Sequence, residues 1–383
     1  MESLQERFAC LSIARRAEPS QEPTYLLELA CAEPESPGGA GGPLVAVSCS
    51  DRSVRLHCRE TLRLLGQCGG HAGPLCGLRF SPSSGSLLFS GSADGVVRSW
   101  DVRTPGSASP AQEFRAPASL ALCSFDLSCG GAVLCGGTEK QEEDSYLVFW
   151  DVRAAGGAAP PLGVYSESHS DDVTQVRFHP RDPDRLASGS TDGLVNVFDV
   201  RRGCEEEALR ATVNSESSVG CVRWAGRGAD RLLCLSHDEG VFLWDLAQMD
   251  TAEPLSLLHA PQARQDTSLP GGATLDHFVG AAWLEEAETL LVLGGTNRGD
   301  LHLLDCGPGG LRPLCALRGG HSATVRCFHW DPAGGALLTG GEDGQLLLWR
   351  PGAVELSSTK KSSLKSAPPL KHTARGHGQR KRK

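Results

Sequence analysis

Three segments of the chain carry a histidine, a hydroxyl residue and an aspartate at nearly constant spacing. The three sets are His71, Ser90 and Asp94; His169, Ser188 and Asp192; and His321, Thr339 and Asp343. A hydroxyl, an imidazole and a carboxylate are the groups of a nucleophilic triad, in which the imidazole takes the hydroxyl proton and the carboxylate orients the imidazole. One active site needs one such set. Three sets in one chain therefore favour a structural role, with catalysis as the alternative.

Each set lies within a repeated sequence pattern. The clearest copies are residues 87–101, 185–199 and 336–350, and each has a short apolar run, a turn containing Asp-Gly and a second alternating run. Weaker copies cover residues 45–58, 133–151, 231–245 and 290–305. Two alternating runs joined by such a turn predict a β-hairpin. The sequence therefore predicts seven copies of one hairpin-based unit.

The spacing of the units indicates how they assemble. The second run of each unit ends in an aromatic residue or a substitute, at His57, Trp100, Trp150, Phe198, Trp244, Leu304 and Trp349. A period near 40–45 residues with four short strands per unit is typical of a propeller blade. A second aromatic series precedes the first, at Phe80, Phe125, Phe178, Trp224, Trp283 and Trp330. All seven tryptophans are thereby assigned to repeat positions, so none indicates a ligand-stacking site.

Dipeptides at the unit ends resemble those of the WD-repeat family. Units begin at Gly70-His71, Ser168-His169 and Gly320-His321, and they end at Trp100-Asp101, Trp150-Asp151 and Trp244-Asp245. The resemblance covers about residues 8–352 and implies an all-β fold, a seven-bladed WD-repeat β-propeller. We expect residues 1–22 to supply the closing strand of blade 7, residues 23–352 to form the propeller, and residues 353–383 to form a disordered basic tail.

The closing strand can also be predicted from the residues. The seventh unit supplies three strands, and after Trp349 the chain reaches Pro351-Gly352 and the charged tail. The alternating run at residues 8–15 has no other partner. Pairing this run with the last strand would remove an exposed sheet edge.

The resemblance implies that the recurring polar sets are hydrogen-bonded tetrads inside blades. In each, the aspartate holds the histidine, the histidine reaches the hydroxyl, and the hydroxyl meets an indole N–H. The tetrad residues are His71, Ser90, Asp94 and Trp100; His169, Ser188, Asp192 and Phe198; and His321, Thr339, Asp343 and Trp349. The fifth unit has Cys234 at the hydroxyl position, and the sixth has Gly294, Arg298 and Leu304, so we expect these blades to be looser.

An acidic sector is expected on the top face, which in WD propellers carries the loops between strands two and three and the loops between blades. The third unit has an expanded hairpin, and the next inter-blade loop adds two aspartates. The acids are Glu139, Glu142, Glu143, Asp144, Asp171 and Asp172. Such a cluster would attract a basic peptide or protein partner. The alternative is a solvated rim that aids solubility.

The opposite face carries a repeated WDVR motif. It occurs at Trp100–Arg103 and Trp150–Arg153, and FDVRR follows at Phe198–Arg202. The motif resembles that of propellers that dock on the adaptor of cullin-RING ubiquitin ligases, which makes Asp101, Arg103, Asp151 and Arg153 candidate docking residues. The alternative is a local salt bridge at a strand end, worth under about 1 kcal/mol.

Charge divides the chain into an acidic body and a basic tail. Nine of the 37 lysines and arginines lie in residues 356–383 without any acid, so residues 1–355 carry 28 basic and 46 acidic residues, a net charge of −18. The tail has no aromatics or periodicity, which predicts disorder. Arg380, Lys381, Arg382 and Lys383 resemble a nuclear import signal. The tail could instead make weak non-specific contacts with nucleic acid or bind the acidic body.

Several classes of function are not supported by the sequence. No apolar run is long enough to span a membrane and no leader-like apolar segment is present, so we expect an intracellular protein that is not secreted. The 15 cysteines follow no disulfide or metal pattern, which indicates reduced thiols and no cofactor. Hydrolase and nucleotide-binding motifs are absent. A polar insert at residues 259–276 is either a functional or a disordered loop.

The sequence thus predicts a non-catalytic protein-interaction scaffold that is monomeric by itself. We expect it in the nucleus, or in nucleus and cytoplasm, with a basic partner on its top face. The alternative function is a substrate receptor of a cullin-RING ubiquitin ligase.

Overall fold

Asp-Gly turns close the hairpin between strands two and three in three of the sheets. The computed structural model describes residues 4–17, 23–32, 43–103, 109–117, 120–154, 160–247, 254–307 and 310–355. In the second unit, Gly95 adopts a left-handed φ of 78°, and the preceding Asp94 accepts the Val96 N–H at 3.2 Å. Gly193 and Gly344 have the same conformation after Asp192 and Asp343. Aspartate followed by glycine therefore closes the turn and leaves the carboxylate on the inner side of the hairpin.

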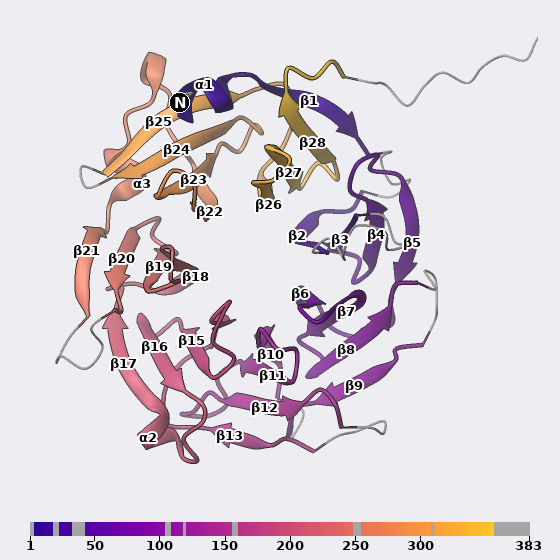
Figure 1. Ribbon diagram of the computed structural model, residues 1–383, viewed down its shortest axis with the longest axis vertical. Helices are drawn as coiled ribbons and strands as arrows, with labels where there is room; N and C mark the ends of the chain where they lie inside the picture. Colours follow the sequence, from indigo (N-terminus) through magenta and orange to yellow (C-terminus); the bar gives the residue numbers. More distant parts are fainter. Residues whose placement is uncertain are drawn as a thin grey trace, which may run out of the picture.

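The strands form seven four-stranded antiparallel sheets arranged in a ring (Figure 1). Blade 1 contains β2 (Leu26–Cys31), β3 (Leu44–Cys49), β4 (Val54–Cys58) and β5 (Leu64–Cys68). Blade 2 contains β6 (Leu75–Ser81), β7 (Ser84–Ser92), β8 (Val96–Asp101) and β9 (Gln112–Arg115). Blade 3 contains β10 (Leu122–Leu127), β11 (Val133–Thr138), β12 (Leu147–Asp151) and β13 (Gly163–Tyr165). The first strand of each blade lines the centre and the fourth lies on the rim.

The remaining blades repeat this order. Blade 4 contains β14 (Gln175–Phe178), β15 (Arg185–Gly189), β16 (Leu194–Asp199) and β17 (Leu209–Asn214). Blade 5 contains β18 (Val219–Ala225), β19 (Arg231–Ser236), β20 (Val241–Asp245) and β21 (Leu255–Ala260). Blade 6 contains β22 (His277–Leu284), β23 (Thr289–Gly295), β24 (Leu301–Gly307) and β25 (Gly310–Leu317). Blade 7 contains β26 (Val325–Asp331), β27 (Ala336–Gly341), β28 (Leu346–Pro351) and β1 (Leu11–Arg16). The predicted seven-bladed propeller is confirmed.

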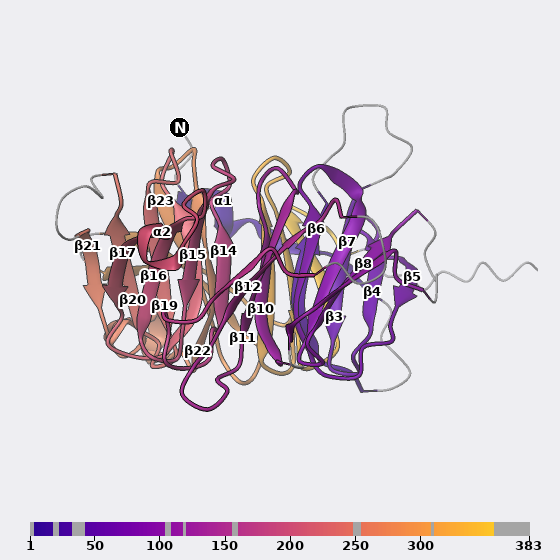
Figure 2. The same ribbon diagram turned by 90° about the horizontal axis from the view of Figure 1, so that it is seen from below.

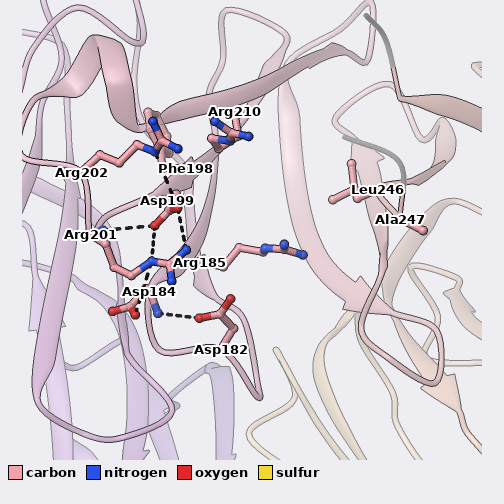
Figure 3. A pocket seen from close by; sticks show the side chains of 10 residues that line it. All are labelled: Asp182, Asp184, Arg185, Phe198, Asp199, Arg201, Arg202, Arg210, Leu246 and Ala247. Atoms are coloured by element: carbon pink, nitrogen blue, oxygen red, sulfur yellow. Dashed lines mark hydrogen bonds and ion pairs between the residues drawn. The ribbon is translucent and has the colours of Figure 1, made fainter. Parts of the chain in front are cut away.

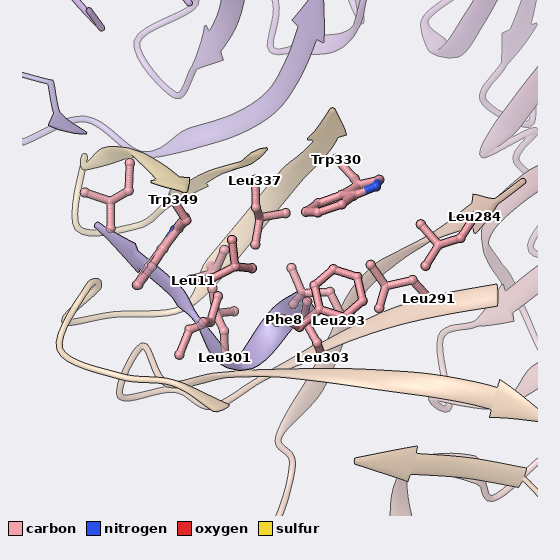
Figure 4. Packing of buried hydrophobic residues seen from close by; sticks show 13 residues of the cluster. Phe8, Leu11, Leu284, Leu291, Leu293, Leu301, Leu303, Trp330, Leu337 and Trp349 are labelled. Carbon is pink, nitrogen blue, oxygen red and sulfur yellow. The ribbon is translucent and has the colours of Figure 1, made fainter. Parts of the chain in front are cut away.

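The N-terminal segment closes the ring beside the last strand of the chain. β1 pairs antiparallel with β28, from Leu11 opposite Pro351 to Arg16 opposite Leu347. The predicted strand began at residue 8, but residues 8 and 9 belong to the short helix α1 (Leu4–Ala9). The helix turns Phe8 inward, where its ring meets Trp330 edge-on at 5.1 Å. Phe8 is fully buried between blades 6 and 7 (Figure 4).

The apolar core is divided among the junctions between blades. The described residues contain seven hydrophobic clusters, and each joins two neighbouring sheets. Each blade therefore depends on its two neighbours for burial, as in other repeat folds. The two further short helices, α2 (Glu205–Ala208) and α3 (Ala263–Asp266), lie in connections outside the sheets.

The alternation of strand direction sorts the loops onto two faces. Successive strands of a blade are antiparallel, so the loop between strands two and three and the loop to the next blade share the top face. The loops between strands one and two and between strands three and four lie on the opposite face, which we call the bottom face. Figure 2 shows the ring from its side with connections extending from both faces.

Candidate functional site

The first polar set forms a closed chain of hydrogen bonds in blade 2. The Trp100 indole donates to Ser90 Oγ at 2.8 Å, Ser90 Oγ lies 2.9 Å from His71 Nε2, and His71 Nδ1 lies 3.0 Å from Asp94 Oδ2. Burial lowers the pKa of His71, partly opposed by Asp94. Although burial alone would raise it, hydrogen bonds from the Ala72 N–H and His71 hold the pKa of Asp94 below its usual value. The neutral imidazole thus links a hydroxyl to a charged carboxylate.

Blades 7 and 4 contain the same arrangement with one difference. In blade 7, His321 lies 2.8 Å from Thr339 Oγ1 and 3.0 Å from Asp343, and Trp349 donates to the same hydroxyl at 2.9 Å. In blade 4, His169 Nε2 lies 2.7 Å from Ser188 Oγ and Nδ1 lies 3.1 Å from Asp192. Phe198 stands where the other two blades have tryptophan, and the Asn196 side chain lies 3.4 Å from His169 Nε2.

The hydroxyl groups of these sets are too deeply buried to act as nucleophiles. Ser90, Ser188 and Thr339 have no exposed surface. A substrate carbonyl cannot reach the hydroxyl oxygen without opening the blade. The hydroxyls instead satisfy buried indole and imidazole groups, which stabilises the sheets against the cost of unpaired polar atoms.

Other blades lack parts of the tetrad, and the structure shows the consequence. In blade 3, Gly136 occupies the hydroxyl position and the Trp150 indole N–H has no hydrogen-bond partner among the described residues. Blade 5 has the buried Cys234 there, and blade 6 has Gly294 opposite His302.

The strand register corrects two assignments made from sequence. Phe80 pairs with Leu88 in blade 2. At the equivalent places the structure has Leu127 beside Leu134 in blade 3 and Ala281 beside Val292 in blade 6. Phe125 therefore lies two residues before the expected position, and Trp283 lies two residues after it. Phe125 fills the space beside the side-chain-free Gly77 and Gly91.

The six predicted acids lie on two adjoining top-face loops, which we call the acidic loop pair. Glu139, Glu142, Glu143 and Asp144 belong to the β11–β12 hairpin, and Asp171 and Asp172 belong to the β13–β14 loop. The loops are joined by hydrogen bonds from the Val173 N–H to the Thr138 carbonyl at 2.9 Å and from the Lys140 N–H to Asp172 at 2.8 Å. The structure therefore brings the acids of two blades together.

The acidic loop pair has an excess of negative charge, with one lysine, Lys140, among its acids. The four hairpin acids are exposed, and none of the six carboxylates forms a salt bridge with a described residue. Burial and the negative charges of Asp172 and Glu139 raise the pKa of the Cys123 thiol to about 12. Acids from both loops therefore lie close enough to Cys123, near the start of β10, to affect its pKa.

The WDVR residues form local ion pairs on the bottom face. Arg103 bonds both oxygens of Asp101 and Arg153 bonds both oxygens of Asp151, with donor–acceptor distances of 2.6–3.2 Å. Hydrogen bonds from Arg103 lower the pKa of Asp101 to about 2. Both arginine side chains remain 74% exposed. The geometry is that of a salt-bridged strand end whose arginine side chain is mostly exposed to solvent.

A belt of charged residues at the centre of the ring was not predicted from sequence. Arg79 in blade 2 bonds Glu28 of blade 1 at 2.7 Å and Asp126 of blade 3 at 2.9 Å. The same carboxylates accept the backbone N–H groups of Leu78 and Phe178. Burial, and to a lesser extent repulsion by the positive charge of Arg79, lowers the pKa of Arg177 to about 10. The belt links four consecutive blades through their inner strands.

The insert at residues 259–276 is folded against blades 5 and 6. Leu269 and Leu275 are buried in the cluster between these blades, and Arg264 donates to the Leu275 carbonyl at 3.1 Å. The insert therefore extends a blade junction, which the sequence left undecided.

The cysteines, possible metal ligands and helices of the described residues are expected from the sequence to show no disulfide, metal or membrane pattern, and what the sequence predicts of cofactors and location stays a prediction. The 15 cysteines are all described and none forms a disulfide. Within the described ranges, no group of His, Cys, Asp and Glu is placed to hold a metal, and no helix is long and apolar enough to cross a membrane. The tail and its candidate import signal, Arg380–Lys383, lie outside the described residues.

Comparisons with known proteins identify the repeat. The family model "WD domain, G-beta repeat" matches residues 62–101, 160–199 and 312–350. The chain is 32% identical to WD repeat-containing protein GTS1 of Arabidopsis thaliana, over 80% of this chain and 78% of that protein. It is 26% identical to the WD repeat-containing protein 89 homolog of Dictyostelium discoideum, over 80% and 79%. It is also 24% identical to the Arabidopsis transcriptional corepressor LEUNIG_HOMOLOG, over 81% of this chain and 34% of that protein.

Proposed function

This chain belongs to the WD-repeat family, whose propellers are scaffolds for protein interactions, and we propose that its acidic loop pair binds a basic segment of a protein partner. The family resemblance seen in the sequence is thereby confirmed. The proposal is supported by the four carboxylates of the β11–β12 hairpin, which are exposed and form no salt bridge among the described residues. The hairpin is joined to the second loop by the hydrogen bond from the Lys140 N–H to Asp172.

Electrostatics explain why a basic segment suits this surface. Carboxylates that are not neutralised by neighbouring cations add their potentials, and the net charge of −18 on residues 1–355 has the same sign. A lysine- or arginine-rich peptide is therefore steered toward the loops and held by several contacts. Glu142 adopts a left-handed φ of 60° within the hairpin, and its side chain is exposed.

The proposed role needs no catalysis. The hydroxyl groups of the three tetrads are fully buried, and WD propellers are generally non-catalytic. The acids of the loop pair supply charge and position only.

A matched pair of variants tests the acidic loop pair. Glu142→Gln/Glu143→Gln removes two exposed charges from the acidic loop pair, whereas Glu206→Gln/Glu207→Gln removes two exposed charges from α2, which contains none of the six acids. Full-length baits are compared by quantitative recovery of partners from cell extract. Partners that bind the loops should be lost with the first variant and retained with the second. Equal recovery with both, and with reversal of all six charges, would refute the proposal.

We further propose a nuclear location, supported by the four consecutive basic residues Arg380–Lys383. One relative is named a transcriptional corepressor, which agrees with a nuclear role. Deletion of residues 380–383 should move a tagged protein to the cytoplasm. An unchanged nuclear fraction would show that the signal lies elsewhere.

A second candidate function is docking to the adaptor of a cullin-RING ubiquitin ligase. The observation that favours it is the pair of 74% exposed arginines, Arg103 and Arg153, at the same position of adjacent blades. Arg103→Ala/Arg153→Ala should abolish co-purification of the adaptor, while Arg227→Ala, another exposed bottom-face arginine, should not. Unchanged recovery with the double variant would remove this candidate.

A further inference from the structure

A polar cavity of about 290 Å³ lies on the bottom face between blades 4 and 5 (Figure 3). Its walls come from the β14–β15 and β16–β17 connections of blade 4 and from Leu246 and Ala247, which follow β20 of blade 5. Four arginines and three aspartates line it: Arg185, Arg201, Arg202, Arg210, Asp182, Asp184 and Asp199. The cavity is thus cationic in an otherwise acidic body.

Asp199 is already saturated by a neighbouring arginine. Arg201 donates to both oxygens of Asp199 at 2.8 Å, and it also lies 3.8 Å from Asp184. Arg202 approaches Asp199 only to 3.8 Å. The Asp182 carboxylate accepts the Asp184 N–H at 3.1 Å. With four arginines and three aspartates, the lining of the cavity carries one more positive than negative charge.

The Arg185 guanidinium has no carboxylate partner among the described residues. It lies directly opposite Asp199 in the β15–β16 strand pair, but the bidentate contact with Arg201 occupies that acid. No hydrogen bond or ion pair of the Arg185 guanidinium is found among the described residues. Figure 3 shows the Arg185 side chain extending away from Asp199 toward the side of the cavity where Leu246 and Ala247 lie. The pKa of His179 is lowered mainly by burial and secondly by the positive charge of Arg185.

The other two copies of the same motif provide an internal comparison. Leu87 lies opposite Asp101 in blade 2, and Val133 lies opposite Asp151 in blade 3. Those blades have the Asp-Val-Arg sequence without the cross-strand arginine. In blade 5, Arg231 lies opposite Asp245 but is placed over the Trp283 ring at 5.6 Å. Blade 4 therefore combines the motif with an additional, uncommitted guanidinium.

We propose that this cavity binds the phosphate of a phosphoserine or phosphothreonine in a protein partner. A guanidinium presents paired N–H donors that match a phosphate, and two of them around one dianion form charge-assisted hydrogen bonds. A single bounded cavity suits one phosphate and the residue that carries it. A nucleic-acid backbone is disfavoured, because the net charge of −18 on residues 1–355 repels a polyanion outside this pocket. The site is separate from the acidic loop pair on the opposite face, so either can fail without the other.

The test uses the full-length chain and two immobilised peptide pools. Both pools have degenerate flanking residues, and they differ only in a central phosphoserine or serine. We expect retention of the wild-type chain to be about tenfold higher on the phosphoserine pool, the effect of one or two charge-assisted hydrogen bonds. Arg185→Gln/Arg210→Gln should reduce retention to the level of the serine pool. Retention should also increase between about pH 5 and pH 7, as the phosphate takes its second negative charge.

The controls separate the cavity from general charge effects. Arg181→Gln/Arg227→Gln removes two exposed charges from the same face and should retain the phosphoserine pool like the wild-type chain. The basic tail is present in every variant, so its contribution cancels. Equal retention on the two pools, or unchanged retention by Arg185→Gln/Arg210→Gln, would overturn the proposal. Retention of a single-stranded oligonucleotide through Arg185, without retention of the phosphoserine pool, would also overturn it.

Discussion

The guanidinium of Arg79 in blade 2 lies 2.9 Å from the carboxylate of Asp126 in blade 3. Its other side bonds Glu28 of blade 1, so one side chain spans three blades at the centre of the ring. Arg79→Met should destabilise the fold by about 3–5 kcal/mol, because it leaves two partly buried carboxylates without their cation. Urea unfolding measures the change. Arg227→Met, which removes a surface ion pair, should cost under about 1 kcal/mol, and equal losses would contradict this account.

The tetrads predict unequal effects of the same substitution in two blades. Ser90→Ala leaves the His71 imidazole and the Trp100 indole unpaired, whereas Ser188→Ala leaves only His169, which still lies 3.4 Å from Asn196. The first substitution should be more destabilising by roughly 1–3 kcal/mol, the cost of one more unpaired buried group. Thermal or urea unfolding tests the order. In the Ser90→Ala background, Trp100→Phe should cost less than it does alone, because the indole has already lost its acceptor.

The inner strand of blade 7 predicts sensitivity to acid. Burial, assisted by the charge of Arg59, lowers the pKa of His329 to about 4. Below about pH 6.5 the unfolded chain takes up a proton at this residue, while the folded chain does so only near pH 4. The free energy of unfolding should therefore fall between these values. His329→Gln should flatten the dependence in this window, and an unchanged pH profile would show that other groups dominate.

The packing of α1 predicts a large effect from one N-terminal residue. Phe8 is fully buried against Trp330 and the leucines of blade 6. Phe8→Ala should destabilise the protein by about 3–5 kcal/mol through the lost contacts and the cavity left behind. Thermal unfolding and hydrogen exchange at β28 report the loss. Leu4→Ala, at a partly buried position of the same helix, is the matched control and should have a smaller effect.

The architecture was predictable because the signals that define a blade are local. An Asp-Gly turn between two alternating runs specifies a hairpin, and its recurrence specifies the ring. The misplacement of Phe125 and Trp283 by two residues has a physical reason. Spacing to the terminal aromatic includes the hairpin lengths, and the β11–β12 hairpin of blade 3 and the β22–β23 hairpin of blade 6 are both longer than those of blade 2, whereas pairing depends on the strands alone. In the same way, alternation at residues 8–15 did not reveal that Phe8 belongs to a helical turn.

The charged features depend on contacts between distant segments. Arg79, Glu28 and Asp126 come from three blades, and nothing in their local sequence indicates that they meet. The charge of the blade 4 cavity depends on which arginine pairs with Asp199. Arg201 is two residues away in the sequence and Arg185 lies opposite on the neighbouring strand, and in the structure Asp199 is paired with Arg201. The acidic loop pair could be located because the resemblance to WD propellers implies that these hairpin and inter-blade loops share a face. The identity of its partner remains a prediction.

The pairing of β1 with β28 has a consequence for synthesis in the cell. As the nascent chain leaves the ribosome, residues 11–16 emerge early and their neighbours at 346–351 emerge after six blades have been translated. During that interval the last junction is open on both sides, and its apolar surfaces are available to chaperones or to other unfinished chains. Because β1 can pair with β28 only after β28 has been synthesised, closure of the ring waits for translation of the seventh blade.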